Sequence, residues 1–130
     1  MCGIAGILRL DRGRPEIATI ESMTEVLAHR GPDDAGVWAQ GAVGLGHRRL
    51  SIIDLSEAGH QPMFNTDRSV AIVFNGEIYN FRDLQKEVRA AGCELFSQSD
   101  TEVILRLYEL HGEGVVDKLQ GMFAFAIWDA

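Results

Sequence analysis

Cys2 is the side chain in this sequence best placed to act as a nucleophile, because it directly follows the initiator methionine. A cysteine at this position can be incidental. Removal of Met1, however, would leave a thiol and a free α-amine on one residue. The ordinary pKa values of these two groups lie within about one unit of each other, so moving the thiol proton to the amine costs about 1 kcal/mol. The amine can therefore act as the general base, and no histidine is required.

A side-chain amide and an unhindered backbone N–H lie next to each other at Asn75 and Gly76, after the apolar run 69–74. An Asn-Gly pair that follows a strand is ordinarily a hairpin turn. At the end of a strand, the same two groups can instead donate two hydrogen bonds to an oxyanion and form an oxyanion hole. The residue types allow both interpretations, and the other segments of the chain have to decide between them.

Two charged positions could recognise a substrate that carries charges of both signs. Arg49 lies in the strand-like run 47–54, where an arginine is usually solvated, but its planar fork can bind a carboxylate. Asp100 lies at an expected helix start, where the helix dipole favours an acid, and it could instead pair with an ammonium group. The sequence around each position leaves both roles open.

The remaining histidines and the second cysteine do not form a recognisable site. The histidines have no spacing typical of zinc ligands, either with one another or with a cysteine. They are His29, His47, His60 and His111. Cys93 follows Gly92 at an expected helix end and is predicted to be a small buried apolar residue. We therefore predict no metal site.

The elements that must position these residues follow from hydrophobic spacing and from turn residues. Residues 3–10 are apolar and predict a strand that starts almost at the terminus. A first helix is predicted over 16–29, beginning after Pro15 and ending before Pro32. Its apolar face would consist of Ile17, Ile20, Met23 and Leu27.

The rest of the chain predicts an antiparallel sheet with two further helices. Short extended runs, separated by Gly, Asp, Asn and Pro, cover 36–40, 42–48 and 69–74. The helices are predicted over about 81–91 and 100–112, and Ser99 and Glu102 fit a capping box at the start of the second. The closing run 122–128 is apolar on both alternating faces, which is typical of a central strand covered on both sides.

Composition and charge narrow the class of protein. With 130 residues, of which 46% are hydrophobic, the chain has the size and apolar content of one domain. No apolar run is long enough to span a membrane, and residues 1–30 lack a secretory signal, so a cytoplasmic protein is expected. Its two cysteines are then expected to be reduced thiols. The net charge of −7, from 19 acidic and 12 basic residues, disfavours nucleic acid as a partner.

Five segments, taken together and in this order, resemble the class II glutamine amidotransferases. They are Met1-Cys2-Gly3-Ile4-Ala5-Gly6, Arg30-Gly31-Pro32-Asp33, Arg49-Leu50-Ser51-Ile52-Ile53, Asn75-Gly76-Glu77-Ile78-Tyr79-Asn80 and Ser99-Asp100-Thr101-Glu102. Three of them, in the form Arg-Gly-Pro-Asp, Arg-Leu-Ser-Ile-Ile-Asp and Asn-Gly-Glu-Ile-Tyr-Asn, are similar to the asparagine synthetase branch of that family. The resemblance extends over residues 1–130.

The resemblance implies an α+β fold of the N-terminal-nucleophile type. In this αββα sandwich, two antiparallel sheets lie between helical layers. Residues 1–130 would form the glutamine amidotransferase type 2 (glutaminase) domain. That domain is expected to be truncated at its C-terminus, because further strands follow in the family. An ATP-dependent synthetase domain would be absent from these residues.

The resemblance also implies a mechanism. Cys2 would attack the side-chain amide of glutamine, forming a glutamyl thioester and releasing ammonia, while Asn75 and Gly76 hold the oxyanion. Water would then release glutamate. Arg49 would bind the substrate α-carboxylate, and Asp100 would lie opposite the α-ammonium. Further substrate contacts are expected from Leu50, Ser51, Ile52, Ile53, Asn75, Gly76 and Glu77.

Cofactors and partners follow from the same resemblance. The glutaminase half needs no cofactor, whereas ATP and Mg²⁺ would act in the missing synthetase domain, which uses the ammonia to make asparagine from aspartate. The expected partners are glutamine and that synthetase domain of the same full-length chain, and a homodimer is left open. Two other interpretations stay open: a glutaminase domain that serves another acceptor, and an inactive fragment whose unpaired strand 122–128 favours association.

Overall fold

The computed structural model describes residues 1–52 and 54–130, and it contains two three-stranded antiparallel sheets. The first sheet has the strand order β1-β3-β2, with β1 over Gly3–Leu8, β2 over Asp34–Gln40 and β3 over Val43–Arg49. The second sheet has the order β4-β5-β6, with β4 over Met63–Phe64, β5 over Val70–Ile78 and β6 over Gly121–Asp129. The predicted strands are therefore present, and β5 and β6 are longer than predicted.

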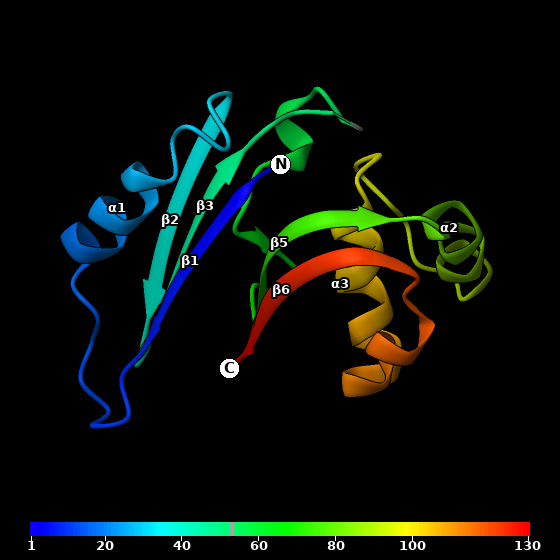
Figure 1. Cartoon of the computed structure of the whole chain (residues 1–130). Coiled ribbons are helices and arrows are strands. Elements are labelled where there is room, and N and C mark those ends of the chain that lie inside the picture. Colours follow the sequence, from blue (N-terminus) through cyan, green and yellow to red (C-terminus); the bar gives the residue numbers. More distant parts are fainter. Residues whose placement is uncertain (53) are drawn as a thin grey trace.

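Helices cover the outer faces of the two sheets (Figure 1). Helix α1, Ile17–Val26, packs on the first sheet. On the second sheet, α3, Asp100–His111, packs on β5, and α2, Phe81–Ala90, packs beside α3. Two short 3₁₀ segments, η1 over Glu57–Gly59 and η2 over Gly112–Lys118, lie in the connections. The layers thus follow the predicted αββα order.

Strand β5 lies in the middle of the sandwich because both of its faces are apolar. Ile72 and Phe74 belong to the core formed with α2 and α3. Ala71 and Val73 point to the other face, where they pack with residues of β3. A strand with apolar residues on both faces can be buried between two layers, which holds its position from both sides.

The inward face of α1 differs from the predicted face. Ile20 is fully buried as expected, but Ile17 and Met23 are exposed, and Thr24 is buried instead. The helix lies so close to β3 at Thr24 that a Cβ on Gly46 would be 2.0 Å from Thr24 Oγ1. A small hydroxyl residue fits this close approach better than a long side chain. The helix also ends at Val26 rather than at residue 29.

Asn75 and Gly76 are not a hairpin turn or a strand end, because β5 continues through Ile78 and pairs with β6 along its whole length. This pairing is not apparent from hydrophobic spacing, which explains the wrong interpretation. The apolar run 122–128 predicts a central strand; within the described residues β6 pairs with β5 alone, and Met122 is exposed.

Candidate functional site

A cavity of about 190 Å³ collects most of the side chains that the sequence singles out. Its walls come from both sheets and from the start of α3, so the site lies where the layers meet. The predicted residues that line it are Cys2, Arg49, Leu50, Ile52, Asn75, Gly76, Glu77 and Asp100. Ser51 is not among the lining residues, and Ile53 lies outside the described residues.

Cys2 is held at the edge of the first sheet, one residue before β1 begins. Its side chain is half-buried, and the Leu50 backbone N–H donates to its sulfur at 3.3 Å. Arg30 Nε donates to the Cys2 carbonyl oxygen at 2.9 Å. The pairing of Gly3 with Arg48 in the β1–β3 ladder fixes the next residue. The thiol is therefore positioned by the end of β3 and by the segment that follows α1.

The Arg30–Asp33 segment, predicted to be a structural turn, connects this edge to the residues after β3. Arg48 Nε donates to the Gly31 carbonyl oxygen at 2.9 Å. The Ser51 backbone N–H donates to Asp33 Oδ2 at 2.8 Å. The Ser51 N–H, a predicted substrate contact, thus has a carboxylate partner within the protein.

The Asn75 side chain presents a donor to the cavity. Its Oδ1 atom is buried and has no hydrogen-bond partner among the described residues. The residue lines the cavity, and no described residue accepts a hydrogen bond from its Nδ2 atom. An amide in this orientation can donate to a group that occupies the cavity.

The backbone of β5 leaves a second donor beside this side chain. Along an antiparallel strand, alternate residues direct their N–H and C=O groups to the same side. On the side away from β6, Val70 bonds to Asn65, Phe74 bonds to Gln61 and His47, and Ile78 donates to Asp100. Gly76 belongs to this series, but no described side chain or loop accepts its N–H. This N–H is therefore available to a group in the cavity.

Gly76 must be glycine at this position. Its φ angle is +155°, which side-chain-bearing residues rarely adopt, and a Cβ there would lie 2.3 Å from the Met122 carbonyl oxygen. The neighbouring atoms are backbone atoms of β6, which cannot move aside without breaking the ladder. The unhindered N–H is thus a consequence of close strand packing.

Arg49 is buried, and its guanidinium already makes two contacts with the loop that follows β3. Nη1 donates to the Ser56 carbonyl oxygen at 2.7 Å, and Nη2 donates to the Asp54 carbonyl oxygen. A guanidinium has five N–H donors, so others remain for a ligand. Gly59 lets the loop approach, since a Cβ there would lie 2.1 Å from Nη2.

Asp54 is a residue of the site that the sequence does not reveal. Its carboxylate accepts hydrogen bonds from the Ser56 hydroxyl at 2.6 Å and from the Gln98 backbone N–H at 2.8 Å. The Ser56 hydrogen bond lowers the pKa of Asp54. These contacts join the loop that binds the Arg49 guanidinium to the segment that leads into Asp100.

Asp100 is the first residue of α3 and is buried against the end of β5. Its Oδ2 atom accepts a hydrogen bond from the Ile78 backbone N–H at 3.3 Å. Burial raises the pKa of this carboxyl group, because desolvation penalises its charged form. A cationic group in the cavity would counteract that penalty.

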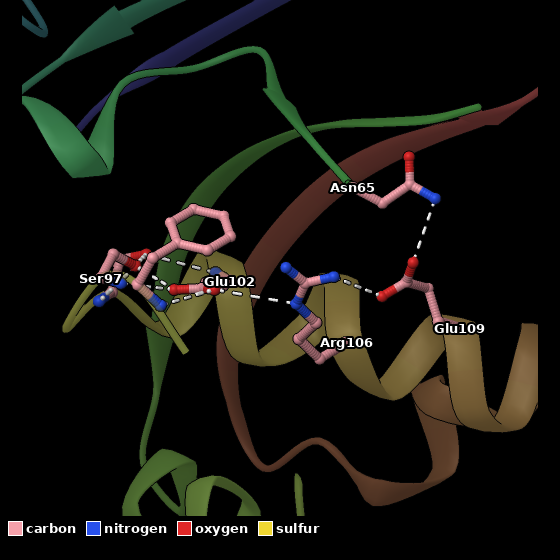
Figure 2. A network of polar contacts seen from close by, with 7 residues as sticks. Asn65, Ser97, Glu102, Arg106 and Glu109 are labelled. Carbon is pink, nitrogen blue, oxygen red and sulfur yellow. Dashed lines mark hydrogen bonds and ion pairs between the residues drawn. The ribbon is translucent and has the colours of Figure 1, made fainter. Parts of the chain in front are cut away.

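A polar network centred on Glu102 and Arg106 lies along α3, the helix that begins at Asp100 (Figure 2). Glu102 is fully buried and accepts hydrogen bonds from the backbone N–H groups of Phe96 and Ser97, at 3.1 and 2.7 Å. Arg106 lies 3.7 Å from the Glu102 carboxylate and continues the network to Glu109 at 2.8 Å. The network fixes the segment before α3 against the helix.

The predicted capping box is half correct. Ser99 Oγ accepts the Glu102 backbone N–H at 3.2 Å, as expected of an N-cap. The Glu102 side chain does not accept the Ser99 backbone N–H, because that N–H donates to Ser97 Oγ at 3.3 Å, and the Ser97 hydroxyl in turn donates to Glu102 Oε2 at 2.6 Å. A nearby hydroxyl that is not part of the motif therefore takes the place of the predicted partner.

The described part of the chain contains neither a cluster of metal-ligating side chains nor a helix that could span a membrane. No group of three or more His, Cys, Asp or Glu side chains there could hold a metal ion. None of the helices in residues 1–52 and 54–130 has the length and apolar character needed to cross a membrane.

The chain matches a known family over its length. The family described as "Glutamine amidotransferase domain" matches residues 1–130. Asparagine synthetase [glutamine-hydrolyzing] 3 of Bacillus subtilis (strain 168) is 46% identical over 132 residues, covering 99% of this chain and 21% of the relative. The nodule asparagine synthetase [glutamine-hydrolyzing] of Pisum sativum is 42% identical over 130 residues, covering 99% and 22%. The chain thus spans about a fifth of the length of these curated relatives.

Solved structures share the fold. Glutamine phosphoribosylpyrophosphate amidotransferase from B. subtilis, complexed with ADP and GMP, gives a TM-score of 0.80 at 21% identity over 99% of this chain and 35% of that chain. A structure described as the allosteric regulatory enzyme of purine biosynthesis gives a TM-score of 0.73 at 22% identity, over 95% and 34%. The predicted sandwich of two antiparallel sheets between helices is confirmed.

Proposed function

This chain belongs to the family of glutamine amidotransferase domains, in the form found in relatives named glutamine-hydrolysing asparagine synthetases, and we propose that it hydrolyses glutamine through a thioester on Cys2. The observation that carries this mechanism is the Gly76 backbone N–H on β5, for which no described residue provides an acceptor. The Gly76 N–H and the Asn75 side chain line the same cavity as the Cys2 thiol. A nucleophile facing two free donors is the arrangement that acyl transfer requires.

The first half of the reaction forms the acyl-enzyme. The Cys2 sulfur attacks the side-chain carbonyl carbon of glutamine, and the α-amine of Cys2 accepts the thiol proton. The tetrahedral oxyanion receives hydrogen bonds from Asn75 Nδ2 and the Gly76 N–H. The amine then gives its proton to the leaving nitrogen, so ammonia departs and a glutamyl thioester remains.

The second half regenerates the thiol. Water attacks the thioester carbon, the same two donors stabilise the second oxyanion, and the Cys2 amine relays the proton to sulfur as glutamate leaves. The mechanism requires cleavage of the peptide bond between Met1 and Cys2, because an amide nitrogen cannot act as a base. Every proton is accounted for without a metal or a cofactor.

Arg49 and Asp100 line one cavity, and their opposite charges suit the α-carboxylate and the α-ammonium group that an amino acid carries on a single carbon. We assign Arg49 to the substrate α-carboxylate, through donors that the Ser56 and Asp54 carbonyls leave free. Asp100 then pairs with the α-ammonium, whose charge offsets the desolvation of that carboxylate. Leu50, Ile52 and Glu77 also line the cavity.

The fate of the ammonia concerns a longer protein. We propose that it serves the synthesis of asparagine from aspartate, as the names of the relatives suggest, with ATP and Mg²⁺ acting outside these residues. The proposed partner is a synthetase domain of the same full-length chain, because the relatives are about five times longer than the matched part.

The test measures glutamate and ammonia release from glutamine by chain whose loss of Met1 has been verified by mass spectrometry. Cys2→Ala should abolish both products. Cys93→Ala is the matched control and should remain active, since Cys93 packs against the core around α2 and α3 and does not line the cavity.

Equal activity of the wild type and Cys2→Ala would refute the mechanism. Inactivity of the processed wild type, with glutamine binding intact, would refute it as well if a longer chain that contains residues 1–130 is also inactive. Turnover by the wild type and Cys93→Ala alone would establish it.

A further inference from the structure

The backbone of Phe74, the residue before the two proposed oxyanion donors, is held by side chains instead of by a neighbouring strand. The Phe74 N–H donates to Gln61 Oε1 at 2.6 Å, and its carbonyl oxygen bonds to His47 Nε2 at 3.0 Å. Strand β4 reaches only as far as Ile72 along β5, so no described strand pairs with Phe74 on this side. His47 and Gln61 replace the missing strand at this position.

His47 connects the two sheets. It lies on β3 of the first sheet and is almost completely buried, while Phe74 lies on β5 of the second. Because a carbonyl oxygen only accepts, Nε2 must carry the ring proton. Burial lowers the pKa of His47 to about 4, so the ring is neutral near pH 7 and this single donor is maintained. Two residues further on, β3 ends at Arg49, beside the Cys2 contact at Leu50.

Gln61 connects the same point to the start of α3. Its Oε1 atom is committed to the Phe74 N–H, and its Nε2 atom donates to Thr101 Oγ1 at 3.1 Å. Both partners are buried, and Thr101 directly follows Asp100 in the first turn of the helix. The orientation of the Gln61 amide is therefore determined by two bonds of opposite direction.

The Phe74 peptide is therefore connected to three parts of the site. His47 links it to β3, which ends beside Cys2, and Gln61 links it to the start of α3 beside Asp100. Asn75 and Gly76 follow it directly on β5. A shift of the Phe74 peptide would move the Asn75 side chain and the Gly76 N–H together, because they follow it directly along the strand. Displacement of catalytic groups by about 1 Å commonly costs about 100-fold in rate.

We propose that His47 and Gln61 are positioning residues for the oxyanion hole, holding the Phe74 peptide so that Asn75 and Gly76 face the Cys2 thiol. The inference rests on the proposed glutaminase function. Neither residue touches the substrate carbonyl in this role, so each acts through the backbone of β5.

The proposal predicts a specific kinetic signature. An oxyanion exists only in the transition state and the tetrahedral intermediate, so a misplaced hole lowers kcat and leaves KM nearly unchanged. Alkylation of Cys2 by iodoacetamide displaces iodide and forms no oxyanion, so its rate should not change. Loosening of the whole site would alter all three quantities.

The experiment compares a disruptive and a conservative variant at each position, with kcat and KM for glutamine hydrolysis and the Cys2 alkylation rate measured by peptide mass spectrometry. His47→Leu removes the donor, whereas His47→Gln can place an amide N–H near the Nε2 position. Gln61→Met removes both bonds, whereas Gln61→Glu keeps the acceptor. We expect kcat to fall about 10- to 100-fold in His47→Leu and Gln61→Met, with a smaller loss in His47→Gln and Gln61→Glu.

An unchanged kcat in folded His47→Leu and Gln61→Met would overturn the proposal, and so would parallel changes in KM and alkylation rate. If those variants do not fold, Thr101→Val decides, since it removes only the second bond of Gln61: a lowered kcat at constant KM supports the proposal, and wild-type kinetics contradict it. Absence of glutaminase activity both in residues 1–130 and in a longer chain that contains them would refute the proposed function itself, whereas an active wild type with unaffected variants would refute only the positioning role.

Discussion

The two walls of the cavity are built in different ways. The strand wall, residues 74–78 of β5, has its backbone fixed by pairing with β6 on one side and by His47, Gln61 and Asp100 on the other. The loop wall, residues 49–52 and 54–59 with 97–100, is held by side-chain contacts to backbone groups, chiefly those of Arg49 and Asp54. Groups that must meet an oxyanion tolerate little displacement, and they lie on the strand.

The difference predicts that the two walls fail differently. Changes in the strand wall should affect kcat or the stability of the whole fold, because β5 is also the centre of the core. Changes in the loop wall should affect substrate binding and leave the rest of the sandwich intact. The predictions below test this separation.

The largest effect is expected from Gly76→Ala in the strand wall. The new Cβ would lie 2.3 Å from the Met122 carbonyl oxygen and 2.6 Å from Phe123 Cα, both of which belong to the backbone of β6. We expect a loss of about 3 kcal/mol or more in the free energy of unfolding, measured by urea denaturation. Gly114→Ala is the control, because a Cβ there meets no atom within 4 Å. Equal stability of the two variants would contradict the prediction.

Asn75→Ala should separate catalysis from stability within the same wall. The Asn75 side chain makes no hydrogen bond to a described residue, so its removal breaks no bond within the fold. We expect kcat for glutamine hydrolysis to fall about 100- to 1,000-fold, the usual cost of one oxyanion donor. KM and the thermal midpoint should change little. A rise in KM with constant kcat would place Asn75 in substrate binding instead.

The hydrogen bond from His47 on β3 to the Phe74 carbonyl oxygen on β5 should make the free energy of unfolding depend on pH. The pKa of His47 is lowered to about 4 by burial, below the ordinary value of 6.5, so the unfolded chain binds the proton more readily. The contribution of neutral His47 to stability is complete above about pH 6.5 and is lost as the pH falls toward 4. We expect a loss of up to about 3 kcal/mol over this range.

His47→Gln provides the comparison, since it cannot titrate. Its stability should fall less than that of the wild type between pH 6.5 and 4 in urea denaturation, because Asp100 and the other acidic groups are common to both proteins. Parallel pH profiles of the two proteins would show that His47 is not the group responsible.

Asp54→Asn should give the smallest effect and confine it to the loop wall. The asparagine oxygen can still accept from Ser56, but its amide would face the Gln98 N–H, so one hydrogen bond to a charged acceptor is lost. We expect KM for glutamine to rise about tenfold, corresponding to about 1.4 kcal/mol, with kcat nearly unchanged. Asp67→Asn is a control, because that carboxylate bonds only within an exposed turn. A fall in kcat alone would show that the two walls are not separable.

Much of the fold could be predicted because local patterns and tertiary packing agree. The helices over 81–91 and 100–112 were placed within one residue of the observed bounds, since their amphipathic spacing and cap residues act locally. The predicted face of α1 is wrong at Ile17 and Met23, because Thr24 is buried instead, through the close approach of Gly46 on β3. The Glu102 partners were missed because Ser97 lies outside the capping motif.

The sequence by itself determined which residue types could perform the chemistry: a cysteine at position 2, an amide beside a glycine, and two opposite charges. Only the tertiary structure decided that Gly76 lies within a continuous strand and that its N–H has no acceptor among the described residues. The contacts by which Asp54, Gln61 and His47 support the site also depend on the tertiary structure. The reason is physical. Reactivity belongs to single side chains and their neighbours along the chain. A backbone N–H, in contrast, is available to a ligand only where no distant segment of the chain accepts its hydrogen bond.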